Sequence, residues 1–210
     1  LDRKIKFTDP VFVEAARIFQ DSLQSVIFPD NTLMTGYGPS RNLFGQQQAA
    51  MWLMGSWELG LASDPDFPAE FTRNVRAMKF PVLKDGKGQK DDLVAWYGGN
   101  YIINKNTEHL DLAKEYLHMY SELFPKIAWD EQAGFPAQSV AASSSDTQLA
   151  KDLLKIAADA VSTSGTAGLD LSTPAFKEDH QRLIQDLSAG LLTPEEFTKQ
   201  LDAAAAKAAN

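Results

Sequence analysis

Apolar side chains recur at three- and four-residue spacing in several segments, which is typical of helices with one buried face. The first segment follows Asp9, which can cap a helix, and Pro10, which tolerates the first helical position, and it runs to Pro29. A second runs from Thr107 to residue 123, where Phe124-Pro125 should end it. Further helices are predicted after the serine-rich residues 143–146, from Thr173 to Gly190, and from Thr193 into the alanine-rich tail.

Three short runs have the composition of β-strands. One is the apolar run 49–54, which ends at Gly55 and which we interpret as a buried strand. The others are residues 75–80, with Pro81 at the edge, and residues 93–103, which two glycines interrupt. These runs do not alternate with the helices as in a βαβ series, and they find no partner strands inside the sequence. The chain is therefore predicted to be an α/β protein that is rich in helices and has a few short strands.

The composition is that of a globular protein and argues against several classes of function. Of the 210 residues, 44% are hydrophobic and none is cysteine, so disulfides, thiolate metal sites and cysteine nucleophiles are excluded. The formal net charge is −8 and the basic residues are scattered, which argues against a nucleic-acid partner. No apolar run approaches the roughly 18 to 20 residues of a membrane-spanning helix.

Motifs of catalysis and of cofactor binding are missing from the sequence. His109, His118 and His180 are far apart and do not have metal-ligand spacing. There is no Gly-x-Ser-x-Gly elbow, no P-loop and no Gly-x-Gly-x-x-Gly motif. The protein is therefore expected to bind a ligand without transforming it, and to use no metal, no cofactor and no catalytic residue. A glycoside hydrolase stays an alternative, because its two carboxylates face each other across a cleft and sequence spacing does not reveal such a pair.

The most informative residues form one run, FGQQQAAMWLMGSW, from Phe44 to Trp57. A Phe, a Gly and an Ala-Met strand that ends in Gly-Ser-Trp resemble the extracellular solute-binding proteins of ABC importers, the family that includes maltose- and oligosaccharide-binding proteins. Further pieces similar to that family follow in its order over nearly the whole chain. They are Phe80-Pro81-Val82, Tyr97-Gly98-Gly99 with residues 102–106, the helix 111–117, the loop Gly134-Phe135-Pro136-Ala137, and residues 190–196 before the last helix.

The resemblance implies a periplasmic-binding-protein-like type II fold, of which this chain would be the C-terminal half. Family members are usually about twice as long, and all the matched pieces lie in their C-terminal half. In that fold two lobes exchange chain segments, so the unpaired strands would pair with strands of the absent half. We expect residues 1–93 to form the first part of the C-terminal lobe, residues 94–150 the hinge crossover and a segment of the N-terminal lobe, and residues 151–210 the last part of the C-terminal lobe.

Trp57 is the first candidate for a ligand contact, because an indole at the end of a strand can stack on a sugar ring. The alternative is an ordinary core or surface tryptophan. Gly98 and Gly99 would let the backbone approach the cleft, unless they form a plain bulge. The resemblance adds Glu58, Trp96 and Tyr97, and it adds Phe176 and Lys177 in the first turn of a helix. Strand alternation turns only one of Trp96 and Tyr97 to the cleft, and helical periodicity favours a core position for Phe176.

The functional hypothesis is a substrate-binding subunit of an ABC importer that closes two lobes around a sugar or oligosaccharide. Its partners would be a small-molecule ligand, expected to be a carbohydrate, and a membrane permease. Its location would be extracellular or periplasmic, with a lipid anchor conceivable upstream of Leu1. The alternatives are a carbohydrate-active enzyme, a binding protein for a non-sugar solute, and a structural or interaction module. The start at Leu1, with neither an initiator Met nor a signal segment, indicates that residues were removed or that the numbering begins inside a longer protein.

Overall fold

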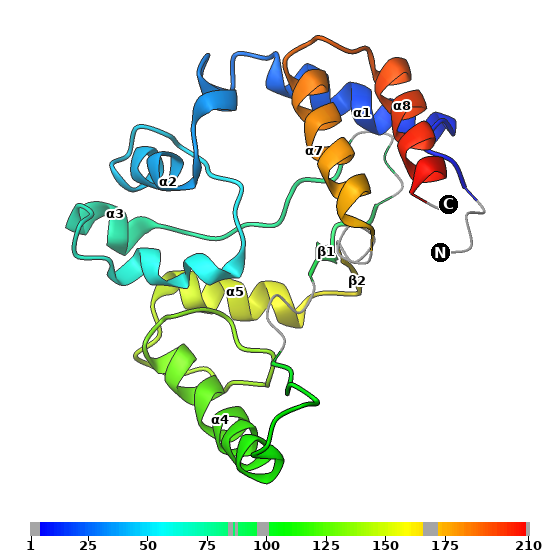
Figure 1. The fold of residues 1–210 in the computed structure, drawn as a ribbon. Coiled ribbons are helices and arrows are strands. Elements are labelled where there is room, and N and C mark those ends of the chain that lie inside the picture. The colour runs from blue at the N-terminus through cyan, green and yellow to red at the C-terminus, as the bar shows by residue number, and fades with distance from the viewer. Residues whose placement is uncertain (1–4, 84–85, 87, 96–100, 166–171, 209–210) are drawn as a thin grey trace. The chain divides into compact units, whose positions relative to one another are not determined.

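The computed structural model of the protein describes residues 5–83, 86, 88–95, 101–165 and 172–208, and the chain divides into two compact units (Figure 1). Unit 1 consists of Leu1–Pro39 with Ala167–Asn210, and unit 2 of Ser40–Thr166. Each unit has a hydrophobic core of its own. Among the described helices, none is long and apolar enough to cross a membrane.

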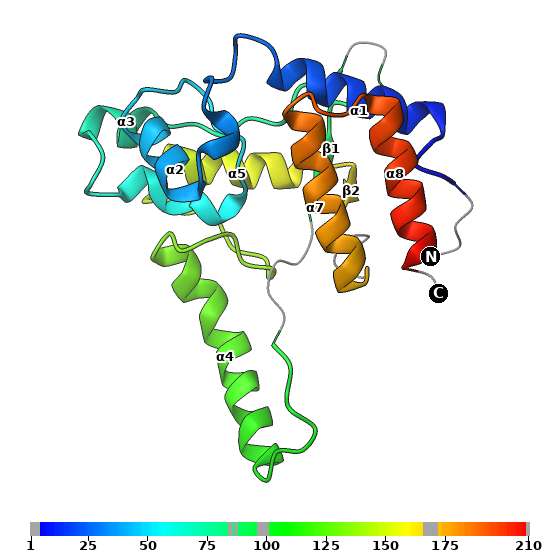
Figure 2. The same cartoon turned by 45° about the horizontal axis from the view of Figure 1, so that its top comes forward.

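Unit 1 is built on the helices α1 (Pro10–Leu23), α7 (Pro174–Ser188) and α8 (Pro194–Lys207), which pack against one another (Figures 1 and 2). All three begin with proline, as predicted from Asp-Pro and Thr-Pro pairs, because a proline lacks only an N–H that the first turn leaves unpaired anyway. Their apolar faces meet in a core that consists of Ala16, Phe176, Leu183, Leu187, Phe197, Leu201 and Ala204.

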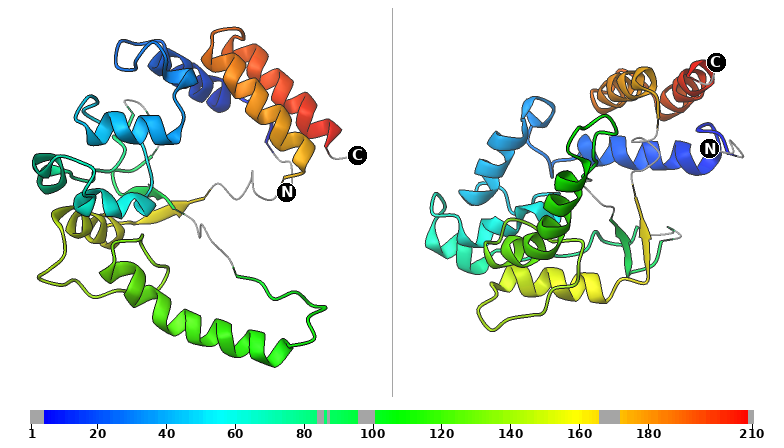
Figure 3. Two further views of the ribbon diagram at one scale, coloured as in Figure 1. Left: turned by 60° about the vertical axis from the view of Figure 1, so that its left-hand side comes forward. Right: turned by 60° about the horizontal axis from the view of Figure 1, so that its bottom comes forward.

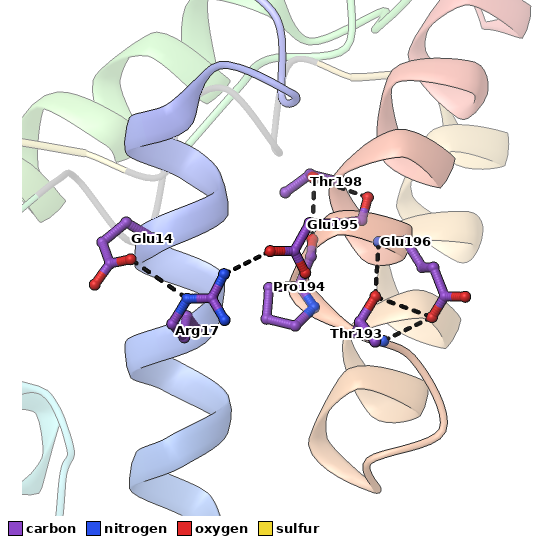
Figure 4. Close-up of polar contacts among 7 residues, drawn as sticks. All are labelled: Glu14, Arg17, Thr193, Pro194, Glu195, Glu196 and Thr198. Atoms are coloured by element: carbon purple, nitrogen blue, oxygen red, sulfur yellow. Dashed lines mark hydrogen bonds and ion pairs between the residues drawn. The ribbon is translucent and has the colours of Figure 1, made fainter.

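The predicted helix boundaries around Gly190 and Thr193 are confirmed by their hydrogen bonds. Gly190 has φ +72°, a left-handed conformation that favours glycine, and it follows the end of α7. Thr193 and Glu196 form a capping box at the start of α8 (Figure 4). Thr193 Oγ1 accepts a hydrogen bond from the Glu196 N–H at 3.2 Å, and Glu196 Oε2 accepts one from the Thr193 N–H at 2.9 Å. In the same view Arg17 of α1 forms an ion pair with Glu195.

The helix α1 ends at Leu23, short of its predicted end at Pro29. Two serine hydroxyls bond to backbone carbonyls near this point: Ser22 Oγ donates to the Ile18 carbonyl at 2.7 Å, and Ser25 Oγ donates to the Ser22 carbonyl at 2.6 Å. Hydroxyl groups that bond locally compete with the helical pattern. The chain continues through irregular structure to the 3₁₀ helix η1 (Thr32–Met34).

Unit 2 contains most of the irregular structure. Its helical elements are α2 (Tyr37–Gly45, which begins just before the unit), the 3₁₀ helix η2 (Ser56–Ser63), α3 (Ala69–Asn74), α4 (Leu110–Asp130) and α5 (Gln148–Ala158). Thr147 caps α5, as its side chain accepts a hydrogen bond from the Ala150 N–H. The buried core residues are Leu59, Leu61, Phe67, Phe71, Val75, Trp129, Leu149 and Ala150.

The predicted end of the second long helix at Phe124-Pro125 is wrong, because α4 continues through Pro125 to Asp130. Pro125, Ala128 and Trp129 are all buried, and the Trp129 indole N–H donates to Asp146 Oδ1 at 3.1 Å. Burial of the last turn therefore outweighs the hydrogen bond that a proline removes from a helix.

The strand predictions are mostly wrong as well. Residues 49–54 and 75–80 form no strand, and the third run contributes only β1 (Asp92–Val94) among its described residues. Contrary to the expectation that no partner exists, β1 pairs in parallel with β2 (Ser162–Ser164), in the register Asp92 to Ser162. A strand needs a neighbour for its backbone groups, and within the described ranges the other two runs have none.

A half-buried histidine of unit 1 should have a measurable titration. His180 lies 6.3 Å from Phe176 between ring centroids and lines an apolar cavity of about 240 Å³. Burial lowers the pKa of His180 below its usual value of 6.5.

We therefore predict that acidification destabilises the protein through His180. Below about pH 6.5 the unfolded chain takes up a proton that the folded chain resists, so the free energy of unfolding falls as the pH drops toward 5. Urea unfolding followed by circular dichroism at pH 7 and pH 5 should show a smaller loss for His180→Gln than for the parent. Equal losses would contradict this role of His180.

Candidate functional site

Trp57 lies on the surface of unit 2, in the first turn of η2. The residues that follow it point inward: Leu59 and Leu61 are buried in the core of the unit. The Trp57 side chain keeps 54% of its surface exposed. The short apolar helix thus holds the indole at the surface while its other side chains anchor the backbone.

Two glycines that are far apart in the sequence meet at Trp57. A Cβ atom on Gly55 would lie 2.1 Å from Trp57 Cζ3, so the indole rests directly against the Gly55 backbone and a larger residue there would displace it. Gly134 has φ +147°, and a Cβ atom there would lie 3.8 Å from Trp57 Cα. The structure therefore brings the Gly-Ser-Trp motif and the Gly-Phe-Pro motif together, a contact that their separation along the chain does not indicate.

Glu58 points into unit 2 and belongs to an ion-pair network. It is only 7% exposed, and its Oε2 accepts a hydrogen bond from Arg41 Nε at 3.0 Å. Arg41 also donates to Asp64 Oδ2 at 2.8 Å, and its guanidinium lies 4.9 Å from the centroid of the Phe67 ring. The cation thereby joins α2 to both ends of η2.

The pKa values of the two carboxylates in this network move in opposite directions. Burial raises the pKa of Glu58, and the negative charge of Asp64 raises it further. The backbone N–H of Asp66 and then the Arg41 guanidinium lower the pKa of Asp64. Sequence reasoning named Glu58 but missed Arg41 and Asp64, because no local motif connects residues 17 and 23 positions apart.

Four of the candidate residues, Trp96, Tyr97, Gly98 and Gly99, lie outside the described residues. The chain before them belongs to the two-stranded ladder, since the Ala95 N–H donates to the Ser164 carbonyl at 3.0 Å. Tyr101, which follows them, is exposed and contacts Tyr120 of α4.

Phe176 and Lys177 lie in unit 1, in the first turn of α7. Phe176 is 8% exposed and stacks on Phe7 with ring centroids 6.1 Å apart, so it occupies the core position that helical periodicity favours. Lys177 is partly exposed. Trp57 and Glu58 lie in unit 2, so each unit contains one pair of the candidate residues.

Two other kinds of site have little support in the part of the chain that the structure describes. The cavity beside His180 is lined mainly by apolar side chains, among them Phe12, Phe19 and Ile184, and does not suit a polar solute. Within the described ranges, no group of three His, Asp or Glu side chains is placed to hold a metal ion.

Comparison with known proteins identifies a sequence family and a shared fold. Residues 4–122, more than half of the chain, match the family of bacterial extracellular solute-binding proteins. No curated protein matches the sequence. One similar solved structure comes from work on xylan utilization by the thermophilic bacterium Caldanaerobius polysaccharolyticus; its TM-score is 0.81 and its identity 23%, over 95% of this chain and 51% of that chain.

A second similar structure is described as a chitin oligosaccharide binding protein. Its TM-score is also 0.81 and its identity 22%, over 99% of this chain and 51% of that one. The chain therefore spans about half the length of both solved structures. These likenesses confirm the predicted fold class, a helix-rich part of a periplasmic-binding-protein-like type II structure, and they are consistent with the predicted C-terminal half.

We predict that Arg41→Met lowers the free energy of unfolding by about 2 to 3 kcal/mol, because it takes the guanidinium away from a buried carboxylate. Urea unfolding at pH 7, followed by circular dichroism, measures the loss. Arg17→Met is the matched control: it removes the ion pair with Glu195, whose two side chains are half exposed, and it should cost at most about 1 kcal/mol. Equal losses in the two variants would show that the Arg41 network does not anchor η2.

Proposed function

The chain belongs to the bacterial extracellular solute-binding proteins, and from this premise we propose that it is the C-terminal half of the substrate-binding subunit of an ABC importer for a sugar or oligosaccharide. In this proposal two lobes close around the ligand by bending at a hinge and present it to a membrane permease. The single observation that carries the proposal is the surface position of Trp57, held there by Gly55 and by the core side chains of η2.

The chemistry of Trp57 suits a carbohydrate. The flat apolar face of an indole packs on the C–H groups of a sugar ring, while its N–H reaches a polar partner. The indole already packs against the Gly55 backbone, and this contact limits the side-chain entropy that is lost when a ligand binds. Two similar solved structures come from work on xylan utilization and on chitin oligosaccharide binding, which supports a carbohydrate ligand here too.

The buried position of Glu58 defines a supporting role for it. Its carboxylate is engaged by Arg41 inside the unit, so Glu58 would fix the backbone beside Trp57 rather than contact a sugar. Lys177, and the residues 96–99 outside the described ranges, stay candidates for ligand contacts. Phe176 would act from the core, where it supports the first turn of α7.

The lobe assignment is part of the proposal. Residues 1–93 and 151–210 would belong to the C-terminal lobe, and residues 94–150 would cross the hinge into the N-terminal lobe and return. The coverage of 51% of each similar structure supports the half-protein part of this assignment. Exposed apolar residues support it as well: Met51, Leu53, Met78 and Phe80 are 67 to 78% exposed in segments that have no ladder partner among the described residues.

The remaining partners follow from the family. An extracellular or periplasmic location fits a bacterial extracellular solute-binding protein, and the proposal adds a membrane permease as acceptor of the ligand. A lipid anchor would lie upstream of Leu1.

We predict that Trp57→Ala weakens oligosaccharide binding by the complete protein about tenfold, the equivalent of the roughly 1.4 kcal/mol that an aromatic contact can supply. Isothermal titration calorimetry with a panel of xylan- and chitin-derived oligosaccharides measures the change. Trp57→Phe should retain part of the affinity, and Tyr37→Ala, a change at an equally exposed aromatic residue, should leave it unchanged.

Two results would contradict the proposal. If the complete protein binds only a polyamine, a metal chelate or a phosphorylated compound, the carbohydrate assignment is wrong. If it turns over an aryl glycoside and a single Asp or Glu change abolishes the turnover, the protein is an enzyme.

A further inference from the structure

The long helix α4 carries an exposed apolar stripe, which we call the α4 stripe. Its side chains recur at the three- and four-residue spacing that places them on one face of a helix. All are between 51 and 64% exposed. They are Leu112, Tyr116, Met119, Leu123 and Ile127.

Among the described residues, α4 is buried against the rest of unit 2 at its C-terminal end. Its buried residues, Pro125, Ala128 and Trp129, lie in the last turns, and Asp146 accepts the hydrogen bond from Trp129. Figure 2 and the left view of Figure 3 agree that this end is the one near α5, while the N-terminal turns of α4 extend away from it.

Aromatic contacts stiffen α4 along one edge of the stripe. Tyr120 lies 4.8 Å from Phe124 and 4.6 Å from Tyr101 between ring centroids, and the hydroxyls of Tyr101 and Tyr120 share a hydrogen bond. Tyr116 stacks on Tyr120 at 6.3 Å. The stripe therefore lies on a preorganised helix, and such a surface loses little entropy when it is covered.

A helix with one apolar stripe gains most of its stability by burying that stripe against another layer. The α4 stripe extends over 15 residue steps, or roughly 22 Å at about 1.5 Å per residue. Within the described ranges no element covers it. The side of α4 opposite the stripe is charged or polar, for example Lys114, Glu115 and Glu122, whereas the half-buried Leu117 and Tyr120 adjoin the stripe and widen its apolar face.

We propose that the α4 stripe is the docking surface for the part of the same polypeptide that lies outside residues 1–210, an inference that rests on the half-protein assignment in the proposed function. Both similar structures contain about as much chain again as this one, while nearly all of this chain, α4 included, superposes on them. The occupant would be an apolar sheet face or helix of the lobe that residues 94–150 enter.

A second copy of the chain is a weaker occupant on grounds of area. Five half-exposed side chains present on the order of 500 Å² of surface, whereas a stable dimer buries roughly 800 Å² per partner. The stripe alone would not hold two chains together. A covalently connected segment needs less area, because it is already at a high effective concentration.

The absence of cysteine from residues 1–210 allows a direct test by thiol labelling. Leu123→Cys places a thiol on the stripe, and the matched control Glu122→Cys places one on the adjacent polar face. Each variant is made both in the 210-residue chain and in the complete protein, and the rate of reaction with a maleimide is measured. The parent proteins serve as blanks for any other thiol.

We expect the Leu123→Cys thiol to react at least about tenfold more slowly in the complete protein than in the 210-residue chain. The Glu122→Cys thiol should react at the same rate in both. Equally fast labelling of Leu123→Cys in both proteins would overturn the inference. So would a dimeric 210-residue chain, seen by sedimentation, that already protects this thiol.

Calorimetry on the same complete protein separates this inference from the proposed function. If the Leu123→Cys thiol reacts slowly in the complete protein but no carbohydrate binds, the docking inference stands and the carbohydrate proposal is rejected. If carbohydrate binds but this thiol reacts as fast as in the 210-residue chain, only the docking inference is rejected.

Discussion

Backbone pairing is the constraint on which the rest of this structure depends. An apolar segment outside a helix needs a neighbouring strand for its N–H and carbonyl groups, and in this chain the described residues supply such a ladder only between β1 and β2. The two segments 49–54 and 75–80, which the sequence predicts to be strands, have no such ladder among the described residues. Large apolar side chains on both segments are exposed. The run 49–54 has the composition of an interior strand, and the two similar structures are about twice as long as this chain.

The candidate site is built on the same incomplete part of the fold. Trp57 follows directly on the unpaired run that ends at Gly55, and the core side chains of η2, the Arg41 network and Gly134 fix the backbone around it. Unit 2 thus positions the Trp57 indole by contacts within the unit. A ligand site that covers roughly 70 to 90% of a small molecule needs a second side, which the proposal assigns to the other lobe.

The predictions from the sequence were correct where interactions between residues close in the chain determine the structure. Proline and threonine at the starts of α7 and α8, and Gly190 between them, set helix boundaries through contacts of a few residues, and these predictions are confirmed. The predictions were wrong or incomplete where the structure depends on contacts between residues that are far apart in the sequence. Pro125 should end α4, yet burial of Trp129 extends the helix, and Arg41 reaches two carboxylates that no motif connects to it. The strand predictions at residues 49–54 and 75–80 failed for the same reason, since a strand depends on distant neighbours and the described residues supply none for these two runs.

Amide hydrogen exchange at the two unpaired runs tests the central claim most directly. The amides of Met51, Leu53, Met78 and Phe80 should exchange rapidly in the 210-residue chain. In the complete protein the same amides should exchange at least about a hundredfold more slowly, because added strands take up their backbone groups. Slow exchange in the 210-residue chain alone, or equally rapid exchange in both proteins, would contradict the account.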